Sequence, residues 1–373
     1  MEKPINILED GYRVAVKHLH RPLIKDENLL RKVEFIARNI QNRAVVRLLL
    51  ANLLAKIHNP KLDVRKPYTE IGTKDSFSGR HYDEAYISGF ISKHKLPCNP
   101  TTAFLTPALR NRNIVLTPKV NLVGRPPEIY QYVLDVFDLV HKKEADPKIL
   151  LWETLRQLIL YRDDSQARIK SLLKNLEKTG SVPLSSEGIF LLIKQHLECR
   201  GSSRLPVLIV AAAYKTIGVY IKERVLPLTS HTAADKQTRS LGDVQITVRS
   251  DSNVVTSYEM KMKKVTMDDV NIALQKLASY GKKIDNYIFI TTEEINEEVQ
   301  GYCKSLYEQT GGVEFVILDC LSFLRHFLHL FHRYRLQYIE EYQKLVLLEP
   351  DSSVNKPLKE AFLALRQAAE SSE

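Results

Sequence analysis

Two carboxylates and a lysine fall on segments that the sequence predicts to be neighbouring strands. Asp243 lies in the stretch SLGDVQITVRS, and Glu259 and Lys261 lie in NVVTSYEMKMKK. Both stretches alternate polar residues with apolar ones such as Val244 and Tyr258. Because side chains in a strand repeat with a period of two, the charged groups are expected on polar faces. The intervening SDSN is a turn signal, which predicts an antiparallel hairpin. Two carboxylates and a lysine on one sheet face can hold a hard divalent cation and activate water beside a phosphate.

The net charge of +10 is distributed unevenly along the chain. Residues 1–125 hold 22 Lys and Arg against 11 Asp and Glu, so the excess positive charge lies in this first third. A solvated surface usually mixes both signs, and the asymmetry therefore favours a polyanion partner. An inert basic face is the alternative for this feature alone. Together with a phosphate-compatible metal site, it indicates nucleic acid.

The remaining composition bounds the class of protein. A chain of 373 residues is long enough for two domains. Its four cysteines are far apart and form no CxxC pair, which predicts reduced thiols in a cytoplasmic protein. We expect no membrane partner, because no apolar run reaches the length of a span and the first residues lack a signal-peptide pattern. His326, His329 and His332 are spaced by three in a run rich in Leu and Phe, where packing is favoured over a metal stripe.

The best candidate for a domain boundary is the segment 199–206. Residues 1–200 are expected to form a mainly helical, basic DNA-recognition region. Within it, residues 61–125 are rich in Gly, Pro, Ser, Thr and aromatics, and this turn chemistry breaks any long element.

Residues 201–373 are expected to form the catalytic domain. Their order of helix, two or three antiparallel strands, helix, strand, helix and strand predicts an α/β fold with a mixed sheet flanked by helices. Thr266 as N-cap and Gly281 as terminator bound the helix that follows the hairpin. A long helix is expected from about residue 320. The polar residues 350–373 show a weak helical pattern and are expected to be partly disordered.

This arrangement resembles the PD-(D/E)xK nuclease superfamily, in particular the type II restriction endonucleases. The matching positions are Asp243 at the start of one strand and Glu259 and Lys261 on the next, and the order of elements over about residues 204–320 agrees. Gly242 stands where the family has proline. The stretches HTAADKQTRSLGDVQI, KPYTEIGT, SFSGRHYDE and LPCNPTTAFLTPALRN are similar to the SacI-type group. The motif alone is short, and a surface hairpin with a Glu–Lys ion pair is the alternative interpretation.

The resemblance implies a restriction-endonuclease-like core and assigns roles in it. Asp243 and Glu259 would bind Mg²⁺, with Mn²⁺ as a substitute, and the Met260 carbonyl and waters would complete the oxygen shell. Lys261 would hold the attacking water or help to deprotonate it.

Two accessory residues and three groups of DNA-contacting residues complete the expected site. Glu223 is the candidate for a glutamate that related enzymes place on the preceding helix, with an exposed helix-end residue as the alternative. Lys263 shares the face of Lys261 and is expected either to approach a neighbouring phosphate or to be solvated. Candidates for contacts with DNA are polar and basic residues in turn-rich segments: Lys74, Ser76, Ser78, Arg80, His81, Arg110, Asn111, Arg112, Asn113, Lys236, Gln237 and Arg239.

The function expected from these residues is that of a Mg²⁺-dependent type II restriction endonuclease. It would act as a homodimer on double-stranded DNA, because a two-fold protein matches a palindromic site. A cognate DNA methyltransferase is the expected genetic partner, since a sequence-specific nuclease must be kept from its host's genome. Two alternatives stay open: a DNA-repair or junction-resolving nuclease with the same core, and a DNA-binding protein whose core has lost catalysis.

Overall fold

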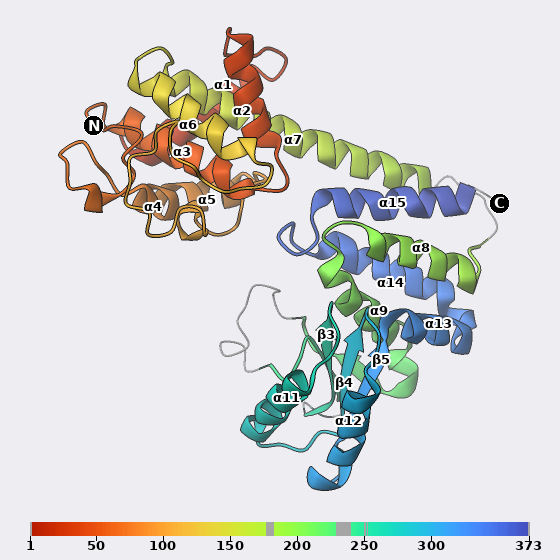
Figure 1. Ribbon diagram of the computed structural model, residues 1–373. Helices are drawn as coiled ribbons and strands as arrows, with labels where there is room; N and C mark the ends of the chain where they lie inside the picture. Colours follow the sequence, from red (N-terminus) through yellow and green to blue (C-terminus); the bar gives the residue numbers. More distant parts are fainter. Residues whose placement is uncertain (1, 177–182, 229–239, 250, 252, 372–373) are drawn as a thin grey trace. The chain divides into compact units, whose positions relative to one another are not determined.

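The chain forms two compact units, Met1–Ala167 and Arg168–Glu373, which are shown in Figure 1. The computed structural model describes residues 2–176, 183–228, 240–249, 251 and 253–371. The division falls within helix α7 (Pro147–Leu176), which is earlier than the boundary expected at 199–206. Residues 168–198 thus belong to the second unit.

The first unit is helical and is built around one buried helix. Its longer helices are α1 (Pro4–Lys17), α2 (Glu27–Arg38), α3 (Arg43–His58), α6 (Glu128–His141) and the first part of α7. Residues 44–55, which make up most of α3, are all buried. A helix that is buried on every side belongs to a core, so the other helices pack around α3.

Residues 59–127 connect α3 to α6 through short elements, as the turn-rich composition predicts. These are η1 (Thr69–Ile71), α4 (Gly79–Tyr82), η2 (Asp83–Ile87), α5 (Ser88–Lys93) and η3 (Ala103–Leu105). The side chain of Arg47 on α3 holds this region in place. Its guanidinium lies 2.7 Å from Asp83 Oδ1 and donates to the carbonyl oxygens of Asn99 and Pro100. Neither side chain of the ion pair has any exposed surface.

The second unit contains a five-stranded mixed sheet in the order β1-β2-β3-β4-β5. The strands are β1 (Glu223–Val225), β2 (Val244–Val248), β3 (Val254–Lys261), β4 (Asn286–Thr291) and β5 (Glu314–Asp319). The first three strands are antiparallel neighbours, and β3, β4 and β5 run parallel. The predictions of an antiparallel hairpin and a mixed sheet are therefore confirmed.

Helices cover both faces of the sheet. Val244, Ile246 and Tyr258 join a core with α8 (Ser186–Glu198), α9 (Leu205–Ile221), α13 (Cys320–Leu330), α14 (Arg335–Leu348) and α15 (Lys356–Ser371). On the opposite face, Tyr287 and Phe289 join a core with α11 (Met267–Tyr280) and α12 (Glu297–Gln309). These are the two sides of an α/β layered architecture.

The helix after the hairpin begins and ends as the sequence predicts. The Thr266 hydroxyl accepts a hydrogen bond from the Asp269 amide at 3.2 Å, and the Asp269 carboxylate accepts one from the Thr266 amide at 3.1 Å. Gly281 follows the helix in the left-handed conformation, with φ of 70°. This reciprocal capping box fixes where α11 starts relative to the end of β3.

Two expectations for the C-terminal part are wrong. The helix expected from residue 320 is broken into α13 and α14 by a 3-10 turn at His332–Tyr334. The polar C-terminal segment forms α15, because its residues Phe362 and Leu363 are buried in the core that also contains α8.

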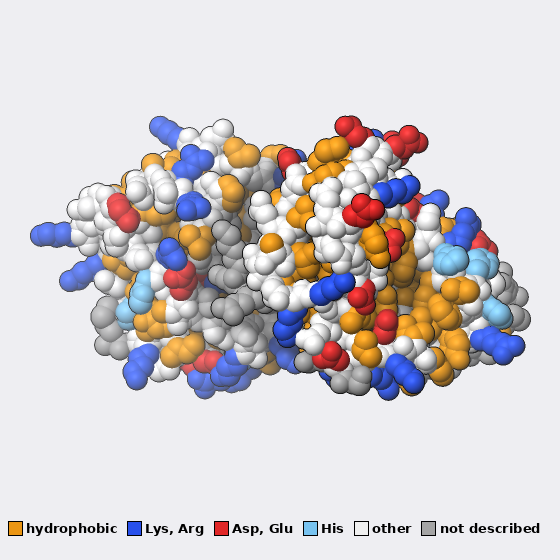
Figure 2. Space-filling model, turned by 90° about the horizontal axis from the view of Figure 1, so that it is seen from below, with side chains coloured by type: hydrophobic (Ala, Val, Ile, Leu, Met, Phe, Trp, Pro, Cys, Tyr) orange, Lys and Arg blue, Asp and Glu red, His pale blue; other side chains and the backbone are white. Residues whose placement is uncertain are grey.

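The three histidines of this region are exposed and do not pack as expected. Figure 2 shows histidine side chains grouped next to apolar ones at the right of the view. His329 Nε2 lies 2.7 Å from Glu187 Oε1, so at least one of the three makes a hydrogen bond at the surface.

One segment, Ser202–Ile221, is long and apolar enough to cross a membrane by length and composition. The expectation of no such run was therefore too strict. Within the fold, 72% of its apolar window is buried, as in the core helix of a globular unit.

Candidate active site

Asp243 lies directly before β2 and is tied to the neighbouring strand. Its Oδ2 accepts a hydrogen bond from the Met260 amide at 2.8 Å. The chain passes so close to β3 here that a Cβ atom at Gly242 would lie 2.5 Å from the Tyr258 carbonyl oxygen. Proline has a Cβ atom, so this approach explains physically why glycine stands at a position where the resembled family has proline.

Three polar side chains approach the Glu259 carboxylate. Lys276 Nζ of α11 lies 3.2 and 3.4 Å from its two carboxylate oxygens, and Lys261 Nζ lies 3.4 Å from Oε1. The buried Tyr287 hydroxyl is 3.3 Å from Oε2 and 2.7 Å from the Leu241 carbonyl oxygen. The Glu259 side chain is 15% exposed, so it is enclosed on most sides and still reachable.

Lys261 is held by the helix that follows its strand. Its Nζ lies 3.0 Å from Asp269 Oδ1, while Asp269 Oδ2 serves the capping box of α11. Burial raises the pKa of Asp269, but the hydrogen bonds from Lys261 and Thr266 outweigh it and lower the pKa below its usual range. One carboxylate therefore joins the start of a helix to the predicted catalytic lysine. Lys263 also approaches Asp269, at 3.7 Å, but its side chain is 68% exposed.

Burial and the neighbouring carboxylate disfavour the charge of Asp243. Burial raises the pKa of Asp243, and the negative charge of Glu259 raises it further. The Met260 hydrogen bond and the positive charges of Arg204 and Lys276 act in the opposite direction, but the pKa remains above its ordinary value. A bound cation would relieve this repulsion between two partly buried carboxylates.

The chemistry of the donors fits a hard divalent cation. Asp243 and Glu259 supply carboxylate oxygens from adjacent segments of the hairpin, and Met260, the residue after Glu259, supplies a main-chain carbonyl. Oxygen ligands of this kind suit Mg²⁺, which usually takes one or two carboxylates and keeps several waters. Within the part of the chain that the structure describes, no three His, Cys, Asp or Glu side chains form a metal-binding group. The fit therefore rests on two carboxylates and a carbonyl.

Glu223 does not lie where the sequence placed it. Helix α9 ends at Ile221 because Lys222 adopts the left-handed conformation, with φ of 59°, and Glu223 opens strand β1. It pairs with Val248, at the end of β2 remote from Asp243. Burial raises the pKa of Glu223, but its register makes it no accessory ligand of the Asp243–Glu259 pair.

The first candidate DNA loop lies around α4, and several of its side chains have local partners. Ser76 Oγ donates to the Thr73 carbonyl at 2.6 Å, and Ser78 Oγ caps α4 by accepting from the His81 amide at 3.2 Å. Arg80 pairs with Glu84 at 2.8 Å on the surface. Lys74, Arg80 and His81 are exposed. These three remain available to a polyanion, whereas the two serine hydroxyls are used in the loop itself.

The second candidate loop presents four consecutive polar residues to solvent: Arg110, Asn111, Arg112 and Asn113. Both asparagines adopt the left-handed conformation, with φ of 55° and 49°, which Asn tolerates better than most residues. Arg112 donates through Nε to the Ala108 carbonyl at 3.1 Å. The third group, Lys236, Gln237 and Arg239, lies outside the described residues.

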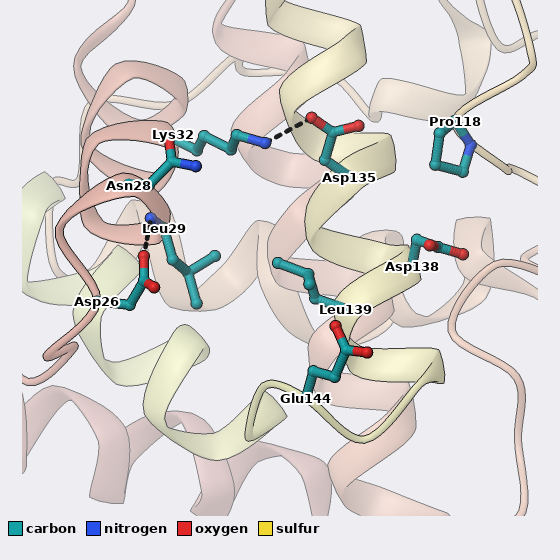
Figure 3. Close-up of a pocket in the computed structure, with 9 residues that line it drawn as sticks. All are labelled: Asp26, Asn28, Leu29, Lys32, Pro118, Asp135, Asp138, Leu139 and Glu144. Carbon is teal, nitrogen blue, oxygen red and sulfur yellow. Dashed lines mark hydrogen bonds and ion pairs between the residues drawn. The ribbon is translucent and has the colours of Figure 1, made fainter.

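A cavity of about 450 Å³ opens in the first unit between α2 and α6 (Figure 3). It is lined by Asp26, Asn28, Leu29, Lys32, Pro118, Asp135, Asp138, Leu139 and Glu144. Four of the lining residues are acidic, and their one lysine, Lys32, lies 2.6 Å from Asp135 Oδ2. The pocket is therefore acidic overall. Phosphate would be repelled here. Lys and Arg side chains lie elsewhere on this unit, and Figure 2 shows them spread over the unit on the left of the view.

Sequence reasoning missed two residues that contact the predicted site, Asp269 and Lys276. They stand seven positions apart on α11, which places them on the same side of the helix two turns apart. The sequence signal for them was this spacing on the helix that directly follows the strand of Glu259 and Lys261. The spacing alone did not show that this side of the helix faces the strand.

The sequence matches no protein-family model and no curated protein. The functional argument therefore depends on the residues and their geometry.

Proposed function

We propose that the chain is a Mg²⁺-dependent endonuclease that cleaves double-stranded DNA at a specific short sequence, as type II restriction enzymes do. The observation that carries this proposal is the cluster at the hairpin. Asp243 is hydrogen-bonded to Met260, the charge of the neighbouring Glu259 acts on it, and Lys261 is fixed by Asp269 at the same edge. The antiparallel β1-β2-β3 unit followed by α11 and the parallel strand β4 supports the resemblance to PD-(D/E)xK nucleases.

Each residue of the cluster has a proposed task. Asp243, Glu259 and the Met260 carbonyl would hold Mg²⁺, which would supply positive charge to stabilise the phosphate as it is attacked. Lys261 orients the attacking water and offsets phosphate charge. Asp269 keeps the Lys261 ammonium in place, because its Oδ1 atom is 3.0 Å from Nζ. A homodimer would present two such sites to the two strands of a palindrome.

The basic first unit is proposed to bind the DNA. Residues 85–127 contain no Asp or Glu and include Lys93, Lys95, Arg110, Arg112, Lys119 and Arg125, all of which are exposed. Each phosphate that such residues neutralise releases condensed counterions, so affinity is expected to fall steeply as salt rises. Arg112→Ala should weaken binding to all sequences alike if Arg112 contacts phosphate, or relax specificity at one position by about 1–3 kcal/mol if it contacts a base.

The test is cleavage of a plasmid of known sequence, followed by sequencing of the product ends. Discrete ends at one short motif, produced with Mg²⁺ or Mn²⁺ and not with Ca²⁺, support the proposal. Cleavage confined to branched substrates would instead indicate a junction-resolving nuclease. Sequence-specific binding without cleavage under any of these ions would indicate a DNA-binding protein with an inactive core.

A further inference from the structure

Lys276 of α11 contacts the site as closely as the lysine predicted from the sequence. Its Nζ lies 3.2 and 3.4 Å from the two carboxylate oxygens of Glu259, whereas Lys261 Nζ is 3.4 Å from one of them. The two lysine side chains are equally enclosed, at 18% and 19% exposure. Lys261 is nearest to Asp269, at 3.0 Å. The ammonium closest to Glu259 therefore comes from the helix and not from the strand.

Lys276 is the lysine that faces Glu259 from α11. Its Nζ approaches both carboxylate oxygens of Glu259, whereas Lys261 Nζ approaches one of them and is shared with Asp269. Asp269 is also approached by Lys263, at 3.7 Å. Lys276 therefore places positive charge beside the predicted metal-binding residue Glu259 from a different element than the strand that carries Lys261.

We propose that Lys276 is a second active-site ammonium, which offsets the charge of the carboxylate pair and adds positive charge where the scissile phosphate is bound. This inference rests on the proposed function. Lys276 forms and breaks no covalent bond in it and acts only through its charge. Two effects of opposite sign follow. The charge weakens cation binding at Glu259, because like charges repel, and it strengthens phosphate binding during cleavage.

A structural role alone would predict something different. A partly exposed ion pair contributes little to stability, so removing Lys276 should leave the fold intact. A merely structural lysine would also leave cation affinity unchanged or reduce it through local loosening. Tighter cation binding combined with slower cleavage is the signature of a charge placed between the metal ligands and the substrate.

The experiment measures Mn²⁺ affinity by calorimetry and plasmid cleavage for the wild type, Lys276→Met and Lys276→Arg. The Met variant should bind Mn²⁺ about 3- to 10-fold more tightly and cleave about 10- to 100-fold more slowly, and the Arg variant should stay near the wild type in both. Lys264→Met is the matched control, because Lys264 is exposed and pairs with Glu294 on the surface. It should change neither quantity.

Wild-type Mn²⁺ affinity or a wild-type cleavage rate in Lys276→Met would overturn the proposal. The Asp243→Asn variant separates this failure from that of the proposed function. If Asp243→Asn binds Mn²⁺ as the wild type does, the carboxylate pair is not the cation site, and both proposals fall. If Asp243→Asn loses Mn²⁺, Lys276→Met gains affinity and the wild type cuts no DNA, the charge effect on the cation site stands and the nuclease proposal falls.

Discussion

Each unit of the molecule holds a cluster of charged side chains withdrawn from solvent, and the two clusters differ in kind. In the first unit, Arg47 and Asp83 are completely buried, and their charges cancel. The remaining donors of Arg47 reach the Asn99 and Pro100 carbonyls and Ser88 Oγ, and Asp83 Oδ2 accepts from Thr102 and Ala103. This cluster is closed and neutral.

The cluster in the second unit is open to solvent and contains two carboxylates, one of which affects the other. The negative charge of Glu259 raises the pKa of Asp243, which burial also raises, and Glu259, Lys261 and Lys276 keep 15–19% of their side-chain surface exposed. A charged group that is buried without full compensation is costly, so such an arrangement persists where a ligand completes it. From this comparison we expect the closed, neutral cluster to stabilise the fold and the open cluster to bind a ligand.

The largest expected effect is a loss of cleavage activity when the open cluster is changed. Asp243→Asn keeps the shape and an acceptor for the Met260 amide but removes the charge. It should lower the cleavage rate on the order of a thousandfold while leaving the unfolding midpoint unchanged or raised. Steady-state plasmid cleavage and thermal unfolding check both parts. Asp251→Asn, an exposed change in the same hairpin, should affect neither. A fully active Asp243→Asn enzyme would remove the open cluster from the chemistry.

A change in the closed cluster should instead lower the stability of the fold. Arg47→Met preserves volume but leaves the Asp83 carboxylate buried without its partner, so it should lower the free energy of unfolding by about 3–5 kcal/mol. Denaturant unfolding measures this loss. The control is Lys32→Met, which breaks the Lys32–Asp135 pair, whose side chains are 20% and 26% exposed, and should cost about 1 kcal/mol or less. Equal losses in the two variants would show that the closed cluster is no more important than a surface pair.

The buried His196 allows a further test, through the pH dependence of stability. Burial lowers the pKa of His196 to about 4, and the ring lies 3.0 Å from both Tyr342 Oη and the Leu358 carbonyl oxygen. In the unfolded chain its pKa is about 6.5. Between these values only the unfolded chain binds the proton, so stability is complete above pH 6.5 and falls by up to about 3 kcal/mol as the pH drops to 4.

The measurement for His196 is denaturant unfolding at pH 7 and pH 5. His196→Gln should be less stable at pH 7 and lose less stability between the two pH values than the wild type. The exposed His332 provides the control, and His332→Gln should leave the free energy of unfolding at pH 7 unchanged. A His196→Gln variant with the wild-type slope would mean that this histidine does not titrate as its burial implies.

The smallest expected effect lies within the open cluster. Lys261→Ala should reduce cleavage more than Lys263→Ala, because Lys261 is 19% exposed and lies 3.0 Å from Asp269, whereas Lys263 is 68% exposed. Asp269→Asn keeps acceptors for the helix cap but removes the charge that holds Lys261, and it should slow cleavage about 10-fold. A greater loss at Lys263 than at Lys261, in the same cleavage assay, would mean that the catalytic lysine is misassigned.

Local signals in the sequence predicted the elements that carry the site. Alternation predicted the hairpin, and Thr266 and Gly281 predicted the limits of α11, because caps and strand periodicity depend on neighbouring residues. The end of α9 was not predictable in this way. It is set by Lys222, a non-glycine residue in the left-handed conformation, so Glu223 opens strand β1 and is not on the helix where both interpretations placed it.

The rest of the site depends on contacts between distant segments. Lys276 reaches Glu259, and Asp269 reaches Lys261, only because α11 packs against the sheet through residues such as Val270. For the same reason α15 is ordered, since its stability comes from burial of Phe362 against other helices and not from its own weak helical pattern.

The most direct test of the account is thermal unfolding with and without Ca²⁺, which can occupy a carboxylate site without supporting turnover. An ion that binds only the folded chain raises the midpoint by mass action. The account predicts that Ca²⁺ raises the midpoint of the wild type, raises that of Arg47→Met from its lower starting value by a similar amount, and leaves Asp243→Asn unchanged. An equal Ca²⁺-induced rise in Asp243→Asn and the wild type would contradict it, because the cation would then bind somewhere other than the open cluster.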